Sequence, residues 1–421
     1  MNAAPAEAPA GGSPAPRTAP ARTRSLVVDA RGLLLSGIGR YLREVVGGVL
    51  ADPRFGPVLL LGRAAELREY LAGREGAEKA RVVPFEHHFY SAAAQVHWAA
   101  LRADGAFFPH YDAPLPPIHP RSVVVVQDLA QFLLPEMFPA WKRALGSVVL
   151  ARAVARAARV VVSSESTRRD LLRRHPDAAP RVVTIPLGVS SRPSEATADA
   201  LERVRGLEPF LLCVGNRKPH KNLVLAVEVL ARLRPRFPGL RLVLAGGGGD
   251  DGVAARAAAL GVAEAVTELG PVTEDVLAAL YARAGVLLFP SLFEGFGLPV
   301  LEAMAAGVPV VSSDRASLPE VAGDAAALVD PEDPDAFAAA AGRLLDEGVH
   351  RAEMVRRGHA RAGELTWART ARRTADLLWD TLSSAPGRMP TAGAAPSARR
   401  QAPDDEPQPA ARDGGGPDED R

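Results

Sequence analysis

The chain has 421 residues and a formal net charge of +1, with 50 Lys and Arg against 49 Asp and Glu. This length exceeds what one hydrophobic core usually supports, so we expect two domains and additional terminal segments. The balanced charge gives no sign of the basic face that nucleic-acid binders use, so we expect no nucleic-acid partner. The single cysteine, Cys213, excludes an internal disulfide and a metal site built from several thiolates.

Both ends of the chain have low sequence complexity. Residues 1–24 and 385–421 are dominated by Ala, Pro, Gly, Arg and Asp. They contain too few large apolar groups to offset chain entropy, so we expect two disordered tails. The first tail lacks the compact apolar segment of a signal peptide, and no apolar run reaches the roughly 18 residues of a membrane span. We therefore expect a cytoplasmic protein.

Between the tails, short apolar runs alternate with amphipathic segments of helical length. A first series of strands is expected at residues 25–29, 58–61, 105–108, 123–126 and 160–162. A second series is expected at residues 210–214, 241–245, 286–289, 308–311 and 326–329. Strands that alternate with helices predict a parallel sheet covered on both faces. The two series therefore predict two Rossmann-like, doubly wound α/β domains, at residues 25–190 and 205–365, with ligands bound in the cleft between them.

The first helix is expected from about Tyr41, after a turn that contains Gly37 and Gly39. Its apolar residues fall on one face, namely Tyr41, Leu42, Val45, Val46 and Val49. Glycine at such a turn permits close approach of a phosphate, although many Gly-x-Gly turns are merely tight. Arg40 is a candidate phosphate or acceptor contact, with the polar face of its helix as the alternative.

The strongest signal lies in residues 289–311. A buried strand is expected to end at Phe289, followed by a Gly-rich turn and a helix that starts near Leu298. The positive end of the helix dipole and three backbone amides predict an anion site, the amides being those of Gly295, Phe296 and Gly297. Leu298 is assigned to the donor site with them.

Two acids flank this predicted anion site. Glu294 precedes the amides and Glu302 lies about one turn inside the helix. Carboxylates accept hydrogen bonds from sugar hydroxyls, which suits a nucleotide sugar; on spacing alone, a surface carboxylate and a simple turn fit equally well. The segment resembles the E-x7-E motif of the family 4 retaining glycosyltransferases, also called glycosyl transferases group 1, of the GT-B superfamily. Residues 316–326 resemble the family's usual continuation. The resemblance implies that Glu294 contacts the transferred sugar and Glu302 the ribose.

A second strand, turn and helix start occupies residues 212–223 and contains several cations. A cation here could neutralise the negative charge that grows on a leaving diphosphate, while a solvated basic loop is the alternative. The segment resembles the family's Gly-containing loop that ends in Arg-Lys-Asn, which implies that Lys221 binds donor phosphate. His220 replaces the common arginine, so we assign a second cation to Arg217, and Asn216 to the donor site with it.

In the first domain, residues 125–129 resemble the family's His-Asp-Leu segment, whose histidine reaches the transferred sugar. Gln127 stands in the place of that histidine, followed by Asp128, and both are assigned to the catalytic group. Glutamine donates and accepts hydrogen bonds but does not titrate near neutrality. His110, which ends the preceding strand, is a cleft candidate or an exposed loop residue.

Three further assignments complete the candidate site. The family's glycine-rich first loop falls at Gly37 and Gly39, which implies donor contacts for both. Val272 falls where family members hold the base against backbone groups. The serines at 163 and 164 are expected to cap a helix rather than to act in catalysis.

The resemblance covers about residues 25–382, including a helix at 366–384 that is expected to cross back onto the first domain. It implies transfer of a hexose of the mannose or glucose class from a nucleotide-diphosphate sugar to a saccharide or lipid-linked acceptor, in polysaccharide or glycan biosynthesis. Retention of configuration and independence of metals and other cofactors are implied as well. Residues 37–41, 109–112 and 219–222 resemble mannosyltransferase-like members, so GDP-mannose is the first expectation for the donor and UDP-glucose the second.

A lipid-linked acceptor would place the protein peripherally at the inner face of the plasma membrane. Two other functions stay open: an epimerase or phosphorylase on the same scaffold, and a non-catalytic protein that binds a sugar nucleotide. The non-catalytic reading rests on Gln127 and His220. Asp333-Pro-Asp335 is expected to form a turn and a helix cap rather than a metal site.

Overall fold

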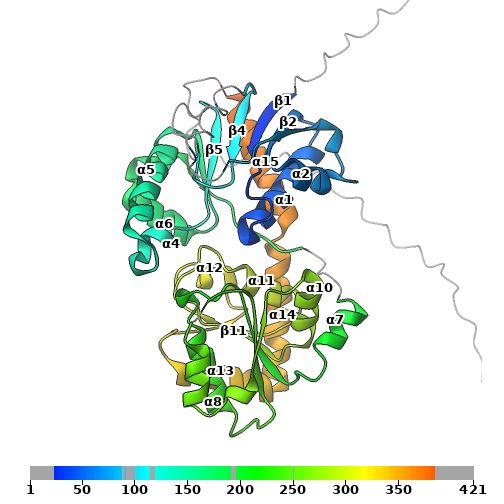
Figure 1. Ribbon diagram of the computed structural model, residues 1–421, viewed down its shortest axis with the longest axis vertical. Helices are drawn as coiled ribbons and strands as arrows, with labels where there is room; N and C mark the ends of the chain where they lie inside the picture. Colours follow the sequence, from blue (N-terminus) through cyan, green and yellow to red (C-terminus); the bar gives the residue numbers. More distant parts are fainter. Residues whose placement is uncertain are drawn as a thin grey trace, which may run out of the picture.

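The computed structural model describes residues 23–87, 91, 98, 101–113, 119–190, 196–249 and 251–384. The predicted tails at 1–24 and 385–421 lie outside these residues, apart from positions 23 and 24. Figure 1 shows two domains, one above the other, each built around its own sheet. The predicted fold class, two doubly wound α/β domains, is confirmed.

The sheet of the first domain has seven parallel strands in the order β3-β2-β1-β4-β5-β6-β7. They are β1 (Arg24–Asp29), β2 (Phe55–Gly62), β3 (Ala80–Pro84), β4 (Gly105–Phe108), β5 (Ser122–Val126), β6 (Arg159–Val162) and β7 (Val182–Thr184). The strand order reverses between β1 and β4, so a crevice is expected beyond their carboxyl ends.

The sheet of the second domain has six parallel strands in the order β10-β9-β8-β11-β12-β13. They are β8 (Phe210–Val214), β9 (Arg241–Ala245), β10 (Val266–Gly270), β11 (Val286–Phe289), β12 (Val310–Ser313) and β13 (Ala327–Val329). Here the order reverses between β8 and β11, which places the second crevice at their carboxyl ends.

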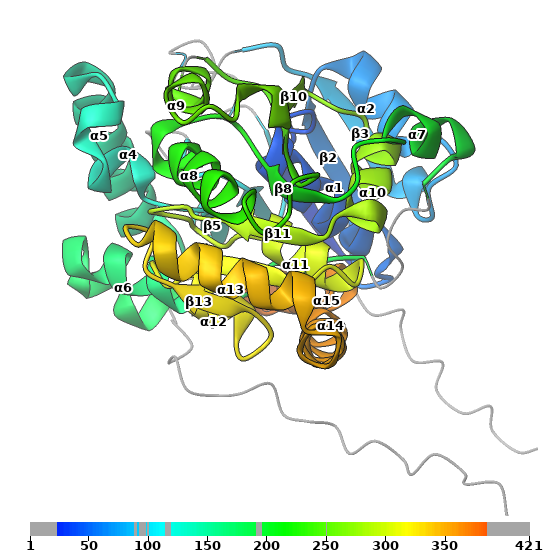
Figure 2. The same ribbon diagram turned by 90° about the horizontal axis from the view of Figure 1, so that it is seen from below.

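Helices pack on the sheets and bury their apolar faces. Those of the first domain are α1 (Ser36–Ala51), α2 (Ala64–Leu71), α4 (Ala130–Leu133), α5 (Ala140–Arg156) and α6 (Glu165–Arg174). Those of the second are α7 (Ala198–Arg203), α8 (Leu223–Leu233), α9 (Val253–Ala259), α10 (Glu274–Arg283), α11 (Leu298–Ala305), α12 (Leu318–Ala322), α13 (Pro334–Asp346) and α14 (Gly348–Glu364). Figure 2 shows α8 and α13 side by side on the second domain. The predicted apolar face of α1 is confirmed, because Tyr41, Leu42, Val45, Val46 and Val49 are all buried.

Three strands escaped the sequence analysis, and all three lie at sheet edges. β3 and β7 are the two edges of the first sheet, and β10 is one edge of the second. Their residues are mostly half-buried, so they lack the continuous apolar run that marks a strand covered on both faces.

The last helix, α15 (Trp367–Ser383), returns from the second domain to the first (Figure 1). It packs on α1, where the Cβ of Ala371 lies 2.8 Å from the position that a Cβ on Gly48 would take. An ion pair of 2.6 Å between Arg54 and Asp376 holds its middle. Within the described part of the chain, no helix combines the length and apolar composition needed to cross a bilayer.

Candidate active site

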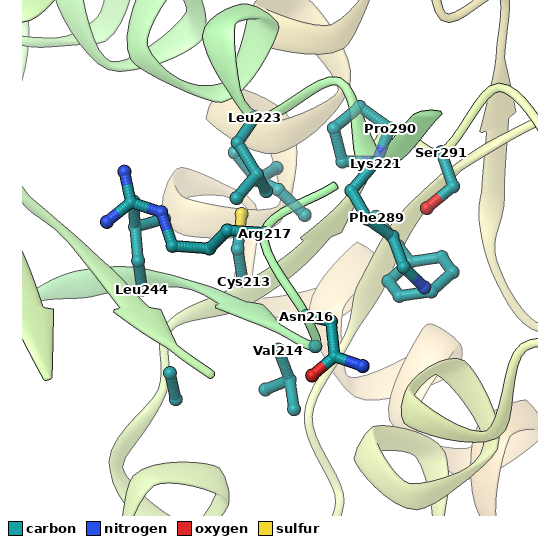
Figure 3. Close-up of a pocket in the computed structure, with 13 residues that line it drawn as sticks. Cys213, Val214, Asn216, Arg217, Lys221, Leu223, Leu244, Phe289, Pro290 and Ser291 are labelled. Atoms are coloured by element: carbon teal, nitrogen blue, oxygen red, sulfur yellow. The ribbon is translucent and has the colours of Figure 1, made fainter. Parts of the chain in front are cut away.

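A pocket opens at the carboxyl ends of β8, β9 and β11, where the strand order of the second sheet reverses (Figure 3). Its floor includes Cys213, whose burial raises the pKa of the thiol to about 12. A thiol in that state is protonated at neutral pH and behaves as an apolar group. The polar wall of the pocket comes from the loop after β8, which carries Asn216 and Lys221.

Lys221 ends a short 3₁₀ turn, Pro219–Lys221, and points toward the loop after β11. Its Nζ donates a hydrogen bond of 2.6 Å to Glu294 Oε1 and lies 5.2 Å from the centroid of the Phe289 ring. The next residue, Asn222, adopts a left-handed conformation with φ of 53° and donates from its side chain to the carbonyl of Pro331. The turn therefore fixes the one cation that faces Glu294 among the described residues of this loop.

The side chain of Ser317 stabilises the turn that carries Glu294. The Ser317 hydroxyl is buried and lies 2.9 Å from the carbonyl oxygens of both Glu294 and Phe296. Gly297, with φ of 105°, then starts α11, and a Cβ there would lie 2.6 Å from Leu318. The sequence analysis missed Ser317, although it lies in the segment 316–326 that resembles the family's continuation.

Glu302 lies one turn inside α11 and contacts both domains. Its Oε1 accepts from Arg40 of α1, and its Oε2 accepts a hydrogen bond of 3.0 Å from the buried Tyr281 hydroxyl. Burial, and then the charge of Glu302, raise the pKa of Tyr281, so its proton stays in place to donate. Both carboxylate oxygens of Glu302 therefore accept hydrogen bonds from protein side chains, which also fix the orientation of the carboxylate.

The first domain contacts the Glu294 turn through Gly295. A Cβ at this position would lie 2.4 Å from the carbonyl oxygen of Gln127 and 2.7 Å from Asp128 Cβ, so only glycine fits. The Gly295 carbonyl oxygen accepts hydrogen bonds from the hydroxyls of Ser163 and Ser164, at 3.1 and 2.8 Å. The start of α6 therefore fixes the spacing between the two predicted halves of the site.

Glu320 of α12 strengthens this junction. Its carboxylate accepts from the backbone amides of Glu165 and Ser166 at the first turn of α6. A negative charge at a helix N-terminus is favourable because the amides there lack partners within the helix. Ser164 also accepts from the amide of Thr167, which confirms the predicted capping role for one of the two serines.

Comparison with known proteins identifies the family of the chain. The family profile described as Glycosyl transferases group 1 matches residues 199–361. The O-antigen chain mannosyltransferase B of Escherichia coli is 33% identical over 59% of this chain and 67% of its own length. A D-inositol 3-phosphate glycosyltransferase of Salinispora tropica is 28% identical over 86% of this chain and 77% of its own. The chain belongs to the group 1 glycosyltransferases.

Solved structures support the fold of this glycosyltransferase. Anabaena Alr3699/HepE, in complex with UDP-glucose, superposes with a TM-score of 0.68 at 16% identity, covering 85% of this chain and 100% of that one. At this identity the likeness concerns the fold alone, and it agrees with the GT-B assignment.

The remaining donor-side candidates are distributed unevenly around the pocket. The guanidinium of Arg217 is held by the Asp251 carboxylate, at 2.6 and 2.8 Å, and by Glu268. Figure 3 shows Arg217 extending to the side away from Lys221. The Leu298 and Val272 side chains are partly buried against the core. Arg217 is thus engaged by two carboxylates in this structure, and Lys221 is the cation that faces Glu294.

Gly37 and Gly39 were expected in a turn before a helix from about Tyr41, but α1 already starts at Ser36, so both glycines lie in its first turn. A Cβ on Gly39 would lie 2.4 Å from the carbonyl oxygen of Leu33, so the close approach of the segment before α1 requires glycine there. Around Gly37, apart from its chain neighbours and the backbone of its own helix, no described atom lies within 4 Å of such a Cβ. The backbone at Gly37 is therefore the more open of the two to an approaching ligand.

Three titratable groups near the cleft have shifted pKa values. Burial, and then the charge of Lys221, lower the pKa of His220 to about 4, so its imidazole is neutral at pH 7 and does not replace the cation of a family arginine. Burial likewise lowers the pKa of His110 to about 4. Desolvation by the surrounding protein, and then the charge of Glu294, raise the pKa of Asp128. Its Oδ1 accepts a hydrogen bond of 3.0 Å from the amide of Ala130, and the side chain stays in contact with solvent.

The side chain of Gln127 is half-buried and its Nε2 lies 3.5 Å from the carbonyl of Pro109. This is a weak contact, so the amide has capacity left for a ligand.

Asp333, which was expected to cap a helix, accepts from the amide of Ala336 at 2.9 Å. That expectation is confirmed.

Proposed function

We propose that the protein transfers a hexose from a nucleotide-diphosphate sugar to a saccharide or lipid-linked acceptor, with retention of configuration and without a metal ion. The observation that carries the proposal is the pairing of Lys221 with Glu294 beside the first turn of α11, with Glu302 one turn further on. The cation of Lys221 and the N-terminus of α11 fit a diphosphate. Glu294 fits the sugar that the diphosphate carries, and Glu302 fits the ribose.

Lys221 would neutralise the charge that grows on the diphosphate as the glycosidic bond breaks. The amides at the start of α11 would supply the remaining stabilisation, in the role that a divalent ion has in other transferases. Glu294, released from Lys221 when phosphate binds, would accept hydrogen bonds from hydroxyls of the transferred sugar. An oxygen of the donor phosphate would take the proton of the acceptor hydroxyl.

The donor is proposed from the relatives. The Escherichia coli relative is named a mannosyltransferase, which supports GDP-mannose as the first candidate. The structural neighbour from Anabaena was solved with UDP-glucose, which supports UDP-glucose as the second. The name of the Escherichia coli relative also refers to the O-antigen chain, which supports a role of this protein in polysaccharide synthesis.

A thermal-unfolding screen against nucleotide sugars tests the donor. A ligand at 100 times its Kd adds about 2.7 kcal/mol to the unfolding free energy, so one donor should raise Tm clearly above the others. The anomeric configuration of the product, read by NMR, then tests retention, and assay with and without a chelator tests metal independence. Donor binding without release of nucleotide diphosphate in any acceptor mixture would point to a non-catalytic protein. Conversion without an acceptor would point to an epimerase or a hydrolase.

A further inference from the structure

Helix α5 exposes an apolar stripe on the side away from its own core. Its buried face consists of Gly146, Val149, Leu150, Ala153 and Val154. Trp141, Leu145 and Val148 are 64%, 39% and 51% exposed. Their spacing of four and three residues puts them on one line along the helix. A large exposed Trp followed by two aliphatic side chains on one line is unusual for a surface that faces only water.

The same helix is strongly basic. It carries four cations and no acid, the cations being Lys142, Arg143, Arg152 and Arg156. Arg152 continues the apolar stripe one turn beyond Val148. No ion pair joins any of the four to another residue in the described ranges, whereas many arginines of the second domain are paired. Lys142, Arg152 and Arg156 are exposed, so their positive charge is available to a partner, whereas Arg143 is half-buried.

The neighbouring helices extend this surface. Leu133 of α4 is exposed, and the Gln131 side chain donates a hydrogen bond of 2.6 Å to the carbonyl of Lys142, which ties α4 to the start of α5. The guanidinium of Arg174 in α6 lies 5.1 Å from the Phe132 ring. We call Leu133, Trp141, Leu145 and Val148, with the exposed cations Lys142, Arg152 and Arg156, the α5 surface.

The α5 surface lies at the outer flank of the first domain, opposite α2, in both views (Figures 1 and 2). None of the described elements of the second domain covers α5 in either view. It is also linked to the cleft, because α4 starts two residues after Asp128. A molecule docked at this flank would therefore lie close to the first-domain side of the active site.

We propose that the α5 surface docks the enzyme on a bilayer that contains anionic lipids. Trp and aliphatic side chains enter the boundary between headgroups and acyl chains, while Lys and Arg remain at the phosphates. A second copy of the chain is disfavoured as the occupant, because a two-fold contact through this face would bring like charges together. The proposal does not depend on the donor or on the acceptor, since binding to a bilayer requires neither.

Sedimentation with vesicles tests the proposal. The full chain should bind vesicles of mixed phosphatidylglycerol and phosphatidylcholine, more weakly at high salt, and should bind pure phosphatidylcholine at least about tenfold less. The double variant W141S/L145S should lose about tenfold or more of the binding to the anionic vesicles. V349S is the matched control, because Val349 is 88% exposed on α14 of the second domain.

A charge pair separates electrostatic attraction from apolar insertion. K142E/R152E should weaken binding to anionic vesicles about tenfold, whereas R68E, an exposed position on α2 at the opposite flank, should not. Circular dichroism should be unchanged in all variants, because every altered side chain is exposed. No binding by the wild type, equal binding to both vesicle types, or equal loss in V349S would overturn the proposal. A dimer in sedimentation equilibrium that W141S/L145S abolishes would overturn it in favour of self-association.

Discussion

The ion pair between Arg40 and Glu302 predicts the direction in which donor affinity changes when Arg40 is replaced. In this structure, Arg40 and Tyr281 occupy the two oxygens of the carboxylate that the family resemblance assigns to the ribose. A ribose hydroxyl that binds Glu302 has to compete with the guanidinium. Replacing Arg40 by Ala should therefore tighten donor binding, because the variant has no pair to break.

The magnitude follows from the burial of the pair. The side chains are 28% and 13% exposed, which lies between a surface ion pair of up to about 1 kcal/mol and a buried charged hydrogen bond of about 1.5–3 kcal/mol. A value near 1 kcal/mol corresponds to a Kd about fivefold lower. Since Arg40 belongs to the first domain and Glu302 to the second, the same substitution should lower the unfolding temperature slightly in the absence of donor.

Isothermal titration with the nucleoside diphosphate and with the nucleotide sugar measures the effect. Arg40→Lys retains the charge and should give a smaller change, and Tyr281→Phe should weaken binding because Glu302 loses the hydroxyl that orients it. If Arg40→Ala instead raises Kd several-fold for the diphosphate alone, Arg40 holds the donor phosphate directly and the competition argument is wrong.

Three further predictions concern the cleft. Lys221→Gln and Glu294→Gln should each lower kcat/KM by about a hundredfold or more, with the lysine variant losing affinity for the diphosphate alone; undiminished transfer in the Glu294 variant would remove its proposed role. Gly295→Ala should cut activity sharply, because its Cβ would overlap the Gln127 carbonyl, whereas Gly363→Ala, in a helix with open space around it, should be neutral or stabilising. His220 has a folded pKa of about 4, below its usual 6.5, so the unfolded chain binds the extra proton first and stability should fall as the pH drops from about 6.5 to 4. His220→Gln should flatten that part of the curve of unfolding free energy against pH, measured by denaturant unfolding at each pH, and an unchanged slope would show that this imidazole is not shielded from protonation.

The sequence predicted the central strands of both sheets because each is a continuous apolar run, which a strand buried on both faces requires. It also predicted the turn before α11, since glycine and proline at fixed positions determine the backbone there locally. The edge strands β3, β7 and β10 were missed for the converse reason: their half-exposed residues carry no such run. Where one element and its own turn define a feature, the sequence was sufficient.

The partners of charged side chains could not be read from the chain. Arg217 was assigned to phosphate on the strength of its loop, yet its guanidinium is held by Asp251 and Glu268, 34 and 51 residues away. Lys221, four residues further along the same loop, faces Glu294 instead. A loop fixes where a side chain starts, but the fold decides which opposite charge it reaches.

The sequence by itself determined the two sheets, the family and the loops that carry Lys221, Glu294 and Glu302, because each depends on local patterns of apolar, glycine and charged residues. Only the tertiary structure decided how these loops meet. Gly295 packs on Gln127, Glu320 lies at the first turn of α6, and Arg40 reaches Glu302 across 262 residues of sequence. Such contacts join separate domains, so they depend on how the two cores are docked, and no local pattern encodes that arrangement.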